Sequence, residues 1–475
     1  MKRLIILSFA TCLLAGCGIY KPYSRPAVTT DSLYRNMPPE DSTSLAALSW
    51  RELFTDEYLQ TLIEQGLKQN TDLRIAHLRV EAAQAVLMNA RLSYLPSVSL
   101  APEGTISHYE STTARSYNLG ASASWEIDIF GKVTNAQRGA KAALENSRAY
   151  EQAVQTQLVA TIANSYYTLL MLDRQLAINE RTLESWEKTV RTLEALKRAG
   201  KSNDAAVLQS KANRMTLEAA IVSIRKSIQE TENSLSVLIA TAPQAIRRGT
   251  LEGQLFPEKL SAGVPIQLLA NRPDVRQTEY ALAQAFYATN AARAAFYPGI
   301  TLSGTAGWNN NGGGIILNPG KWLLNAVGSL TQPLFNRGTN IANLKVAKTQ
   351  QEEAVLSFRQ SILDAGKEVN DALTQWQTAQ ERIGISTRQI VTLQEAVYKT
   401  ELLMRHSSTN YLEVLTAQQS LLNAELIQAQ DLFDKIQGVI NLYHALGGGV
   451  YCNEMFCKFF FCLQFYRIEE EFAED

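Results

Sequence analysis

The sequence is poor in the residues that usually mark chemistry. It has no cysteine between Cys17 and Cys452, so no disulfide framework supports that part of the fold. Its few histidines are scattered without metal-ligand spacing and without a nucleophile motif beside them. They are His77, His108, His406 and His444. We therefore expect no metal site, no cofactor and no enzyme activity.

The chain also lacks an excess of charge of either sign. Its formal net charge is -1, which gives no electrostatic basis for binding nucleic acid. The glycine-rich run 312–314 lacks the Gly-Lys-Ser/Thr of a phosphate-binding loop, and Lys321 stands alone after it. An exposed hairpin tip is therefore the better interpretation of this run.

Proline is missing from two long stretches, 132–198 and 339–405. As a helix, each would extend roughly 100 Å, about three times the hydrocarbon thickness of a bilayer. Charged residues such as Arg174, Lys188 and Glu381 recur every few positions, which excludes both stretches from the interior of a membrane. We expect two very long helices surrounded by water.

Both stretches carry an apolar seam at steps of three and four residues, and each is followed by a second segment with the same spacing. This period indicates helices paired as a coiled coil, although a plain long helix in a soluble bundle stays open as an alternative. Two antiparallel hairpins are expected, with turns at 199–203 and 406–410. The seams contain Leu169, Leu172, Leu176, Asn179, Leu183, Trp186, Val190 and Leu193; Ile221, Ile224, Ile228, Thr231, Leu235 and Leu238; Ile390, Leu393, Val397, Thr400 and Met404; and Leu415, Gln419, Leu422, Leu426, Ala429, Phe433, Ile436 and Ile440.

The second half of the sequence repeats the first. Asn70-Thr71-Asp72-Leu73-Arg74 matches Arg272-Pro273-Asp274-Val275-Arg276, and the segment 95–100 matches 297–302 at the same shift. A period of roughly 200 residues is far too long for a solenoid, so it indicates a duplicated unit of domain size.

Polar and apolar residues alternate in the segments that precede each long helix. Segments 95–100, 117–130, 300–308 and 322–335 have this period of two, which predicts four strands with one polar face. Membrane-spanning barrel strands look like this, and the smallest such barrels have about eight strands. Several chains must therefore contribute to one barrel.

The N-terminus has the pattern of an exported lipoprotein. Met1-Lys2-Arg3 and the apolar run 4–14 read as a secretory signal. Leu14-Ala15-Gly16-Cys17 resembles a bacterial lipobox, in which the cysteine thiol is acylated, and Gly18 favours sorting to the outer membrane. Residues 450–475, with three cysteines and Phe459-Phe460-Phe461, are better explained by an altered reading frame or a poorly ordered tail than by a function.

With these features the chain resembles the TolC-like outer membrane efflux proteins, in particular the lipoprotein branch called the NodT family, which serves resistance-nodulation-division (RND) pumps. The segments 268–279 and 291–300 are similar to that family's signature segments, and Tyr23-Ser24-Arg25-Pro26, 50–54 and 446–449 are similar to its opening and close. The resemblance runs from Leu14 to Gly449.

The resemblance implies a mainly α fold with a membrane β-barrel. It implies a homotrimer with a 12-stranded barrel, four strands per chain, continued by a long α-helical barrel. The chain is then expected to divide into a signal peptide (1–16), a lipidated extended segment (17–56), a first repeat (57–240), a linker (241–266), a second repeat (267–449) and the tail (450–475). Its implied partners are outer membrane lipid, a periplasmic adaptor (membrane fusion) protein and an inner-membrane pump of RND type.

The resemblance also implies where the functional residues lie. Cys17 is the lipid attachment site, and Asp274 is expected to be a helix N-cap. The family's periplasmic gate follows the second hairpin turn in the pattern Asp-Val-Leu-Asp, which here reads Glu413-Val414-Leu415-Thr416. A solvated helix-start carboxylate is the alternative for Glu413. The expected gate residues are Glu413, Thr416 and Arg405, and the expected adaptor-docking residues are Arg198, Gly200, Lys201, Ser407 and Ser408.

The function expected from the sequence is a passive outer-membrane exit duct for solutes delivered by the pump and adaptor. An exit duct for type I protein secretion is one alternative, although the lipobox and the Arg-Pro-Asp segment count against it. A periplasm-spanning structural lipoprotein without a pore is another, and conductance in liposomes would separate it from a duct.

Overall fold

The computed structural model describes residues 20, 22–28, 33, 45, 48–254, 256, 271–310, 321–405 and 411–448, apart from the side chains of 309–310, 321–323 and 405. They belong to two compact units. The first unit contains Met1–Val28, His77–Tyr150 and Asp274–Ser361, and the second contains Thr29–Ala76, Glu151–Pro273 and Ile362–Asp475. Cys17, the 312–314 run, Ser407, Ser408 and the tail 450–475 lie outside the described residues.

One order of elements occurs twice along the chain: a helix, two strands, a very long helix and a shorter helix. The first set is α4 (Thr71–Leu92), β1 (Ser97–Tyr109), β2 (Thr112–Ile127), α5 (Lys132–Arg198) and α6 (Asp204–Leu238). The second set is α8 (Pro273–Ala294), β3 (Gly299–Asn310), β4 (Lys321–Thr331), α9 (Thr339–Arg405) and α10 (Tyr411–Ala445). Outside both sets lie α2 (Trp50–Leu53), α3 (Glu57–Gln69) and the short 3-10 helix η3 (Leu251–Gly253).

The two predicted long helices are confirmed with their predicted bounds, and α5 and α9 have 67 residues each. Glycines in the left-handed backbone conformation mark these bounds. Gly131 and Gly338 precede the two helices with φ of 71° and 77°, and Gly200 follows the first with φ of 68°. Glycine adopts this conformation without steric strain, so the sequence places the helix ends at these positions.

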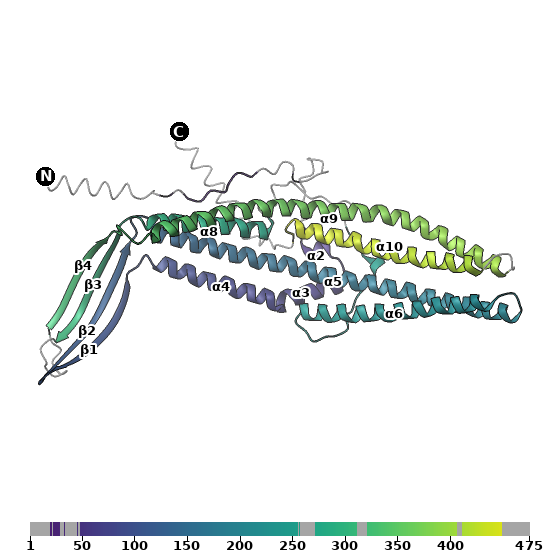
Figure 1. The fold of residues 1–475 in the computed structure, drawn as a ribbon, viewed down its shortest axis with the longest axis horizontal. Helices are drawn as coiled ribbons and strands as arrows, with labels where there is room; N and C mark the ends of the chain where they lie inside the picture. Colours follow the sequence, from purple (N-terminus) through teal and green to yellow (C-terminus); the bar gives the residue numbers. More distant parts are fainter. Residues whose placement is uncertain are drawn as a thin grey trace. The chain divides into compact units, whose positions relative to one another are not determined.

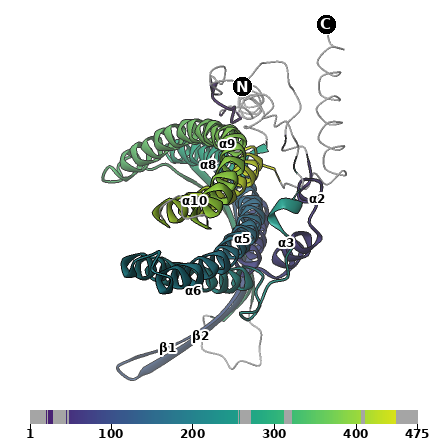
Figure 2. The same ribbon diagram turned by 90° about the vertical axis from the view of Figure 1, so that its right-hand side faces the viewer.

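The predicted hairpins are confirmed, because α5 lies beside α6 and α9 beside α10 in the second unit (Figure 2). The seam residues of α5 are buried or half-buried, as expected for paired helices. The prediction is wrong at one position of the seams. Gln419 is exposed, and its neighbour Gln418 is buried instead, because the amide of Gln418 donates hydrogen bonds to Thr189 and Glu401.

The predicted N-cap at Asp274 is also wrong. The helix α8 begins at Pro273, whose fixed φ suits the first helical position, so Asp274 lies inside the first turn. There its carboxylate is favoured by the positive end of the helix dipole. Within the second unit, the buried Arg272 donates to Glu368 at 2.7 Å and to the carbonyl of Ala445 at 3.0 Å. The Arg-Pro-Asp segment therefore has a structural role at the end of α10.

The four predicted strands are confirmed as one antiparallel sheet in the first unit, in the order β1-β2-β3-β4 (Figure 1). Their bounds differ from the prediction. β1 continues to Tyr109 instead of ending at Leu100, and a two-residue connection at 110–111 leads into β2. The segment 101–109 was missed because it does not alternate cleanly between polar and apolar residues. β2 and β4 end at Ile127 and Thr331, before the predicted ends.

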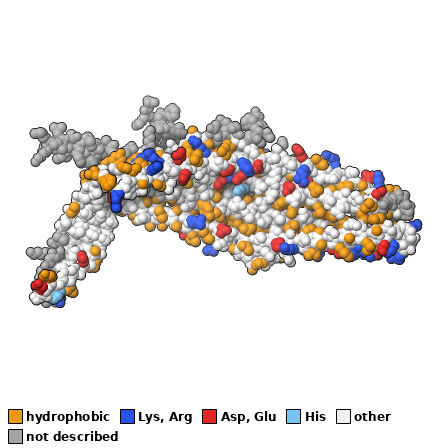
Figure 3. Space-filling view, viewed as in Figure 1, with side chains coloured by type: hydrophobic (Ala, Val, Ile, Leu, Met, Phe, Trp, Pro, Cys, Tyr) orange, Lys and Arg blue, Asp and Glu red, His pale blue; other side chains and the backbone are white. Residues whose placement is uncertain are grey.

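The register gives the sheet one apolar and one polar face, because paired residues lie on the same side of neighbouring strands. On the polar face, the hydroxyls of Ser99 and Ser122 lie 2.8 Å apart. Few charged side chains appear on the sheet surface seen in Figure 3. The apolar face contains Val98, Leu100, Leu119, Trp125, Leu302, Trp308, Leu324 and Leu330, and the polar face contains Ser99, Ser122, Ser124, Ser303, Thr305, Asn325 and Ser329.

The N-terminal segment 22–28 packs on α8 within the first unit. The ring of Tyr23 meets that of Phe286 edge-on, with centroids 5.8 Å apart. Arg25 donates two hydrogen bonds of 2.7 Å to the carboxylate of Glu279. Burial raises the pKa of Tyr23 to about 12, and the charge of Glu279 acts in the same direction. This segment is therefore attached to α8 by both apolar and ionic contacts.

The second unit holds the chain after α6 against the helices. The guanidinium of Arg248 donates to Asp173 of α5 and to Glu232 of α6, both at 2.5 Å. Its side chain is 15% exposed, so this charge is balanced by two carboxylates in a largely buried place.

No helix in the described ranges is long and apolar enough to cross a membrane.

Candidate functional site

The first hairpin turn is built by the backbone around Gly200. The amide of Gly200 donates to the carbonyl of Lys197 at 3.0 Å, and the amide of Lys201 donates to that of Leu196 at 2.9 Å. These two bonds form a Schellman motif, which ends a helix at a left-handed glycine. Asn203 then caps α6 by accepting from the amide of Ala206 at 2.9 Å. A well-defined turn results.

The predicted docking residues of this turn face solvent. Arg198 is the last residue of α5, and Arg198, Gly200 and Lys201 are all exposed. A Cβ added to Gly200 would meet nothing within 4 Å. The turn is braced by Lys197, whose ammonium lies 2.6 Å from the carboxylate of Asp204. These exposed groups are available to a partner protein.

The predicted gate residues lie at the start of α10. Glu413 is in the first turn of this helix, and Glu413 and Thr416 are both exposed. Residues three apart share a face of a helix, so the two side chains project on one side. A carboxylate is also favoured at this end of the helix by its dipole. Arg405 is the last residue of α9, and its side chain is not described.

An apolar cluster brings the two hairpins together beside these turns. It joins Leu193 of α5, Val207 of α6, Met404 of α9 and Val414 of α10, with Tyr411 packed against it. All four helices therefore meet within two turns of the candidate residues. The cluster fixes the start of α10, and with it Glu413 and Thr416, relative to the first hairpin.

Two polar contacts link the hairpins further along the second unit. Gln418 of α10 is 4% exposed and donates to Thr189 of α5 at 3.2 Å and to Glu401 of α9 at 2.9 Å. Arg181 of α5 lies 2.6 Å from the carboxylate of Glu425 of α10. Sequence reasoning missed both contacts, because residues more than two hundred positions apart carry no periodic signal of their pairing.

A buried carboxylate lies deeper in the same hairpin. Asp431 of α10 is 1% exposed, and the guanidinium of Arg382 on α9 lies 2.8 Å from it. Burial raises the pKa of Asp431, the charge of Arg382 opposes this, and Asp434 raises it further. The raised pKa shows that the environment disfavours the charged form even beside a cation.

Among the described residues there is no group of three or more His, Cys, Asp or Glu side chains that could hold a metal ion. The site consists instead of two turns, a helix start with a carboxylate, and contacts that fix one hairpin against the other.

The combination of long helical hairpins with a four-stranded sheet is shared with solved structures of outer-membrane channel proteins. The chain belongs to the outer membrane efflux protein family, whose model matches residues 62–241 and 264–448. Proteins of this family are efflux channels of the outer membrane. The outer membrane is also the location of this chain.

Three known proteins are similar over most of the chain. The cation efflux system protein CusC of Escherichia coli O6:H1 is 30% identical over 452 residues, which cover 94% of this chain and 98% of CusC. The probable outer membrane lipoprotein SilC of Salmonella typhimurium is 29% identical over 459 residues, covering 94% and 99%. The open-state structure of the MtrE channel of Neisseria gonorrhoeae superposes with a TM-score of 0.83 at 29% identity, covering 91% of this chain and 99% of MtrE.

Proposed function

We propose that the protein is the passive exit duct of a tripartite efflux system, supplied by an inner-membrane pump of RND type through a periplasmic adaptor. The observation that carries this proposal is the sheet. β1 and β4 each pair on one side only, and the sheet has one apolar face. A sheet in lipid must close so that no edge is left unpaired. Neighbouring copies of the chain satisfy this need.

We propose the homotrimer with a 12-stranded barrel that the family resemblance implies, and the four strands of each chain are consistent with it. The helices support the same assembly, because apolar residues at steps of seven are exposed along two of them. Leu208, Met215 and Val222 form such a stripe on α6, and Leu356 and Leu363 lie at the same spacing on α9. Stripes of this period indicate contact with another helix. We propose that the two repeats, 57–240 and 267–449 joined by 241–266, each contribute one hairpin to a helical barrel.

The lipid anchor belongs to the same proposal. Tyr20 is three residues from Cys17, and three residues span at most about 10 Å. The segment 22–28 is bound to α8 through Tyr23 and Arg25, so an acyl chain on Cys17 would be held close to this unit. Replacing Cys17 with Ser is expected to abolish labelling by a palmitate analogue. Unchanged labelling of that variant would refute lipidation at this residue.

We place the narrow, adaptor-facing end of the duct at the hairpin turns. Three copies of Glu413 around one axis would attract cations, and salt would screen this attraction. Thr416 leaves this ring with a single carboxylate per chain. The exposed residues Arg198, Gly200 and Lys201 of the first turn, with Ser407 and Ser408 of the second, would receive the adaptor. If Arg198 and Arg405 hold the turns together, replacing either with Ala should raise conductance.

Two measurements test the proposed function. Mass determination of the detergent-solubilised protein should give three chains, and a stable monomer would contradict the assembly. Liposomes containing the purified protein should release a trapped salt gradient without any energy source. A protein that inserts but gives no flux would instead be a structural tether.

A further inference from the structure

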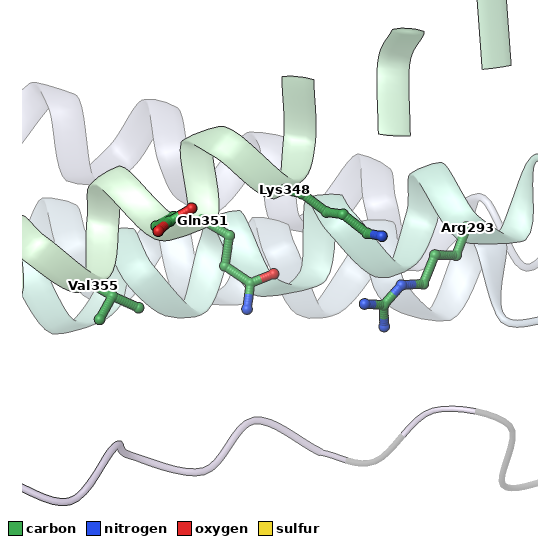
Figure 4. A pocket seen from close by; sticks show the side chains of 5 residues that line it. Arg293, Lys348, Gln351 and Val355 are labelled. Atoms are coloured by element: carbon green, nitrogen blue, oxygen red, sulfur yellow. The ribbon is translucent and has the colours of Figure 1, made fainter. Parts of the chain in front are cut away.

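An open cleft lies between α8 and α9 in the first unit. Its volume is about 360 Å³, and it is lined by Arg293 from α8 and by Lys348, Gln351, Glu352 and Val355 from α9. In Figure 4 the side chains of Lys348 and Arg293 reach toward each other, and Gln351 points into the same space. Two cations, an amide and a carboxylate therefore share one small volume.

The described part of the chain does not neutralise the two cations. Arg293 donates only a hydrogen bond of 3.3 Å, to the amide oxygen of Asn290. Lys348 and Glu352 are one helical turn apart, yet neither Lys348 nor Arg293 forms an ion pair within 4.0 Å among the described residues. Two cations that line one cleft and form no ion pair among the described residues attract an anionic group.

The cleft lies close to the level at which the sheet begins. Arg293 is one residue before the end of α8 at Ala294, and β3 starts soon afterwards at Gly299. At this level the rings of Phe130 and Tyr297 are stacked with centroids 4.9 Å apart. Aromatic side chains gather at the interface between membrane and water. This placement rests on the proposed function: with the sheet spanning the membrane, the cleft lies on the helical side of that interface, at the level of lipid headgroups.

The N-terminal segment reaches the same place. Burial raises the pKa of Tyr20, Tyr297 raises it further, and the charge of Arg293 opposes this. Tyr20 therefore lies within electrostatic range of Arg293, one of the residues that line the cleft. Tyr20 is also only three residues from Cys17. A lipid on Cys17 would therefore hold the part of the first unit that carries Arg293 close to the membrane surface.

We propose that this cleft binds the headgroup of a phospholipid that carries both a phosphate and an ammonium group, such as phosphatidylethanolamine. The phosphate would lie between Arg293 and Lys348, and the ammonium would face Glu352. Arginine and lysine are the usual phosphate-binding side chains, and basic pockets beside a membrane bind lipid headgroups. The volume is at the small end of the range of about 300–1,000 Å³ for small-molecule sites, which suits a headgroup whose acyl chains remain in the bilayer.

Lipid retention by the purified full-length protein tests the proposal. Native mass spectrometry after incubation with phosphatidylethanolamine counts the lipids that remain bound per chain. The double variant Arg293→Gln/Lys348→Gln should retain at least about fivefold less lipid, because two charge-assisted contacts are lost. The matched control Arg359→Gln/Arg388→Gln removes the same charge from exposed positions of α9 outside the cleft and should retain lipid like the parent.

A second variant tests the assignment of the ammonium. Glu352→Gln should lower retention of phosphatidylethanolamine while leaving phosphatidylglycerol, which has no ammonium, bound as before. Thermal unfolding of each variant verifies that it is folded. Equal lipid retention by Arg293→Gln/Lys348→Gln and the parent would overturn the proposal. Equally tight binding of soluble glycerophosphoethanolamine would also overturn it, in favour of a site for free phosphate esters. Neither result depends on whether the protein conducts.

Discussion

The helices α6 and α10 occupy the same place in their repeats and both have 35 residues, but they differ in their surroundings. α10 buries many more of its residues and packs against α5, α6 and α9 through two apolar clusters. α6 instead exposes Leu208, Met215 and Val222. Duplication has therefore left one short helix inside the chain and the other at its edge. An exposed apolar stripe of this kind is typical of a surface that another chain covers, as the proposed assembly requires.

The two helices also differ in the polar groups they bury. α10 buries Gln418 and Asp431, which contact α5 or α9, whereas the buried polar residues of α6 are the small Ser210 and Ser236. Buried polar groups are satisfied only in one arrangement of their neighbours. The second hairpin is thus held more specifically than the first, and it carries the candidate gate.

The equivalent positions Leu422 of α10 and Met215 of α6 give the largest expected contrast. Leu422 is 5% exposed and Met215 is 57% exposed. Leu422→Ala should destabilise the chain by about 2–5 kcal/mol, because it leaves a cavity in a packed cluster. Met215→Ala should leave the unfolding of the single chain almost unchanged and weaken only its assembly. Thermal unfolding, with the mass of the assembly as the second readout, separates the two effects. Equal loss of stability in both variants would contradict the proposed difference between α10 and α6.

Two glycines test the close approach of α9 and α10. A Cβ on Gly438 would lie 2.9 Å from the backbone nitrogen of Trp376, whereas a Cβ on Gly384 would meet nothing within 4 Å. Gly438→Ala should cost about 1–3 kcal/mol from overpacking. Gly384→Ala should stabilise by up to about 1 kcal/mol through helix propensity. Denaturant unfolding of both variants measures the difference, and a stabilised Gly438→Ala would show that the helices are not in tight contact.

The ion pair between hairpins should matter more for conductance than the pair within one hairpin. Arg181 and Glu425 join α5 to α10, while Arg225 and Glu180 join α6 to α5 at 2.7 Å. Glu425→Gln should cost no more than about 1 kcal/mol of stability, since Arg181 is largely exposed. It should nevertheless raise single-channel conductance by freeing α10. Glu180→Gln is the matched control, and a similar rise in that variant would refute a specific role for the link.

The smallest expected effects are opposite dependences on pH. The raised pKa of Asp431 gives a contribution to stability that is present below its ordinary value of 3.8 and is lost as the pH rises through the raised value. The pKa of Glu194 is lowered, first by its hydrogen bond to Lys211, so its contribution is present above 4.5 and is lost as the pH falls.

Melting temperatures measured from about pH 3 to pH 7 test these signs. Relative to the parent, Asp431→Asn should lose less stability as the pH rises, and Glu194→Gln should lose less as the pH falls. Parallel profiles for the parent and Asp431→Asn would mean that the carboxylate is not perturbed in solution.

The elements that follow from local chemistry were predictable from the sequence. The two long helices lack proline, and Gly131, Gly200 and Gly338 mark three of their four ends. The polar run 407–410 marks the fourth. The full length of β1 was not predictable, because its segment from Pro102 to His108 mixes polar and apolar residues without a regular period.

The candidate site was predictable in part. Glu413, Thr416 and the residues of the first turn follow from hairpin positions and from the family resemblance. Their fixation by Leu193, Val207, Met404 and Val414 depends on contacts between two repeats far apart in sequence. The shift from Gln419 to Gln418 at the interface has the same origin, since a long-range hydrogen bond decides which glutamine is buried.

Reversal potentials in planar bilayers under a salt gradient test the central claim most directly, namely that the duct is narrowest where α10 begins. The parent should conduct with a preference for cations. Glu413→Gln should reduce that preference, and Thr416→Asp should increase it by adding a second carboxylate on the same helix face. High salt should weaken both differences from the parent by screening. A parent that passes no current would contradict the duct itself. Unchanged selectivity in both variants would show that the constriction lies elsewhere.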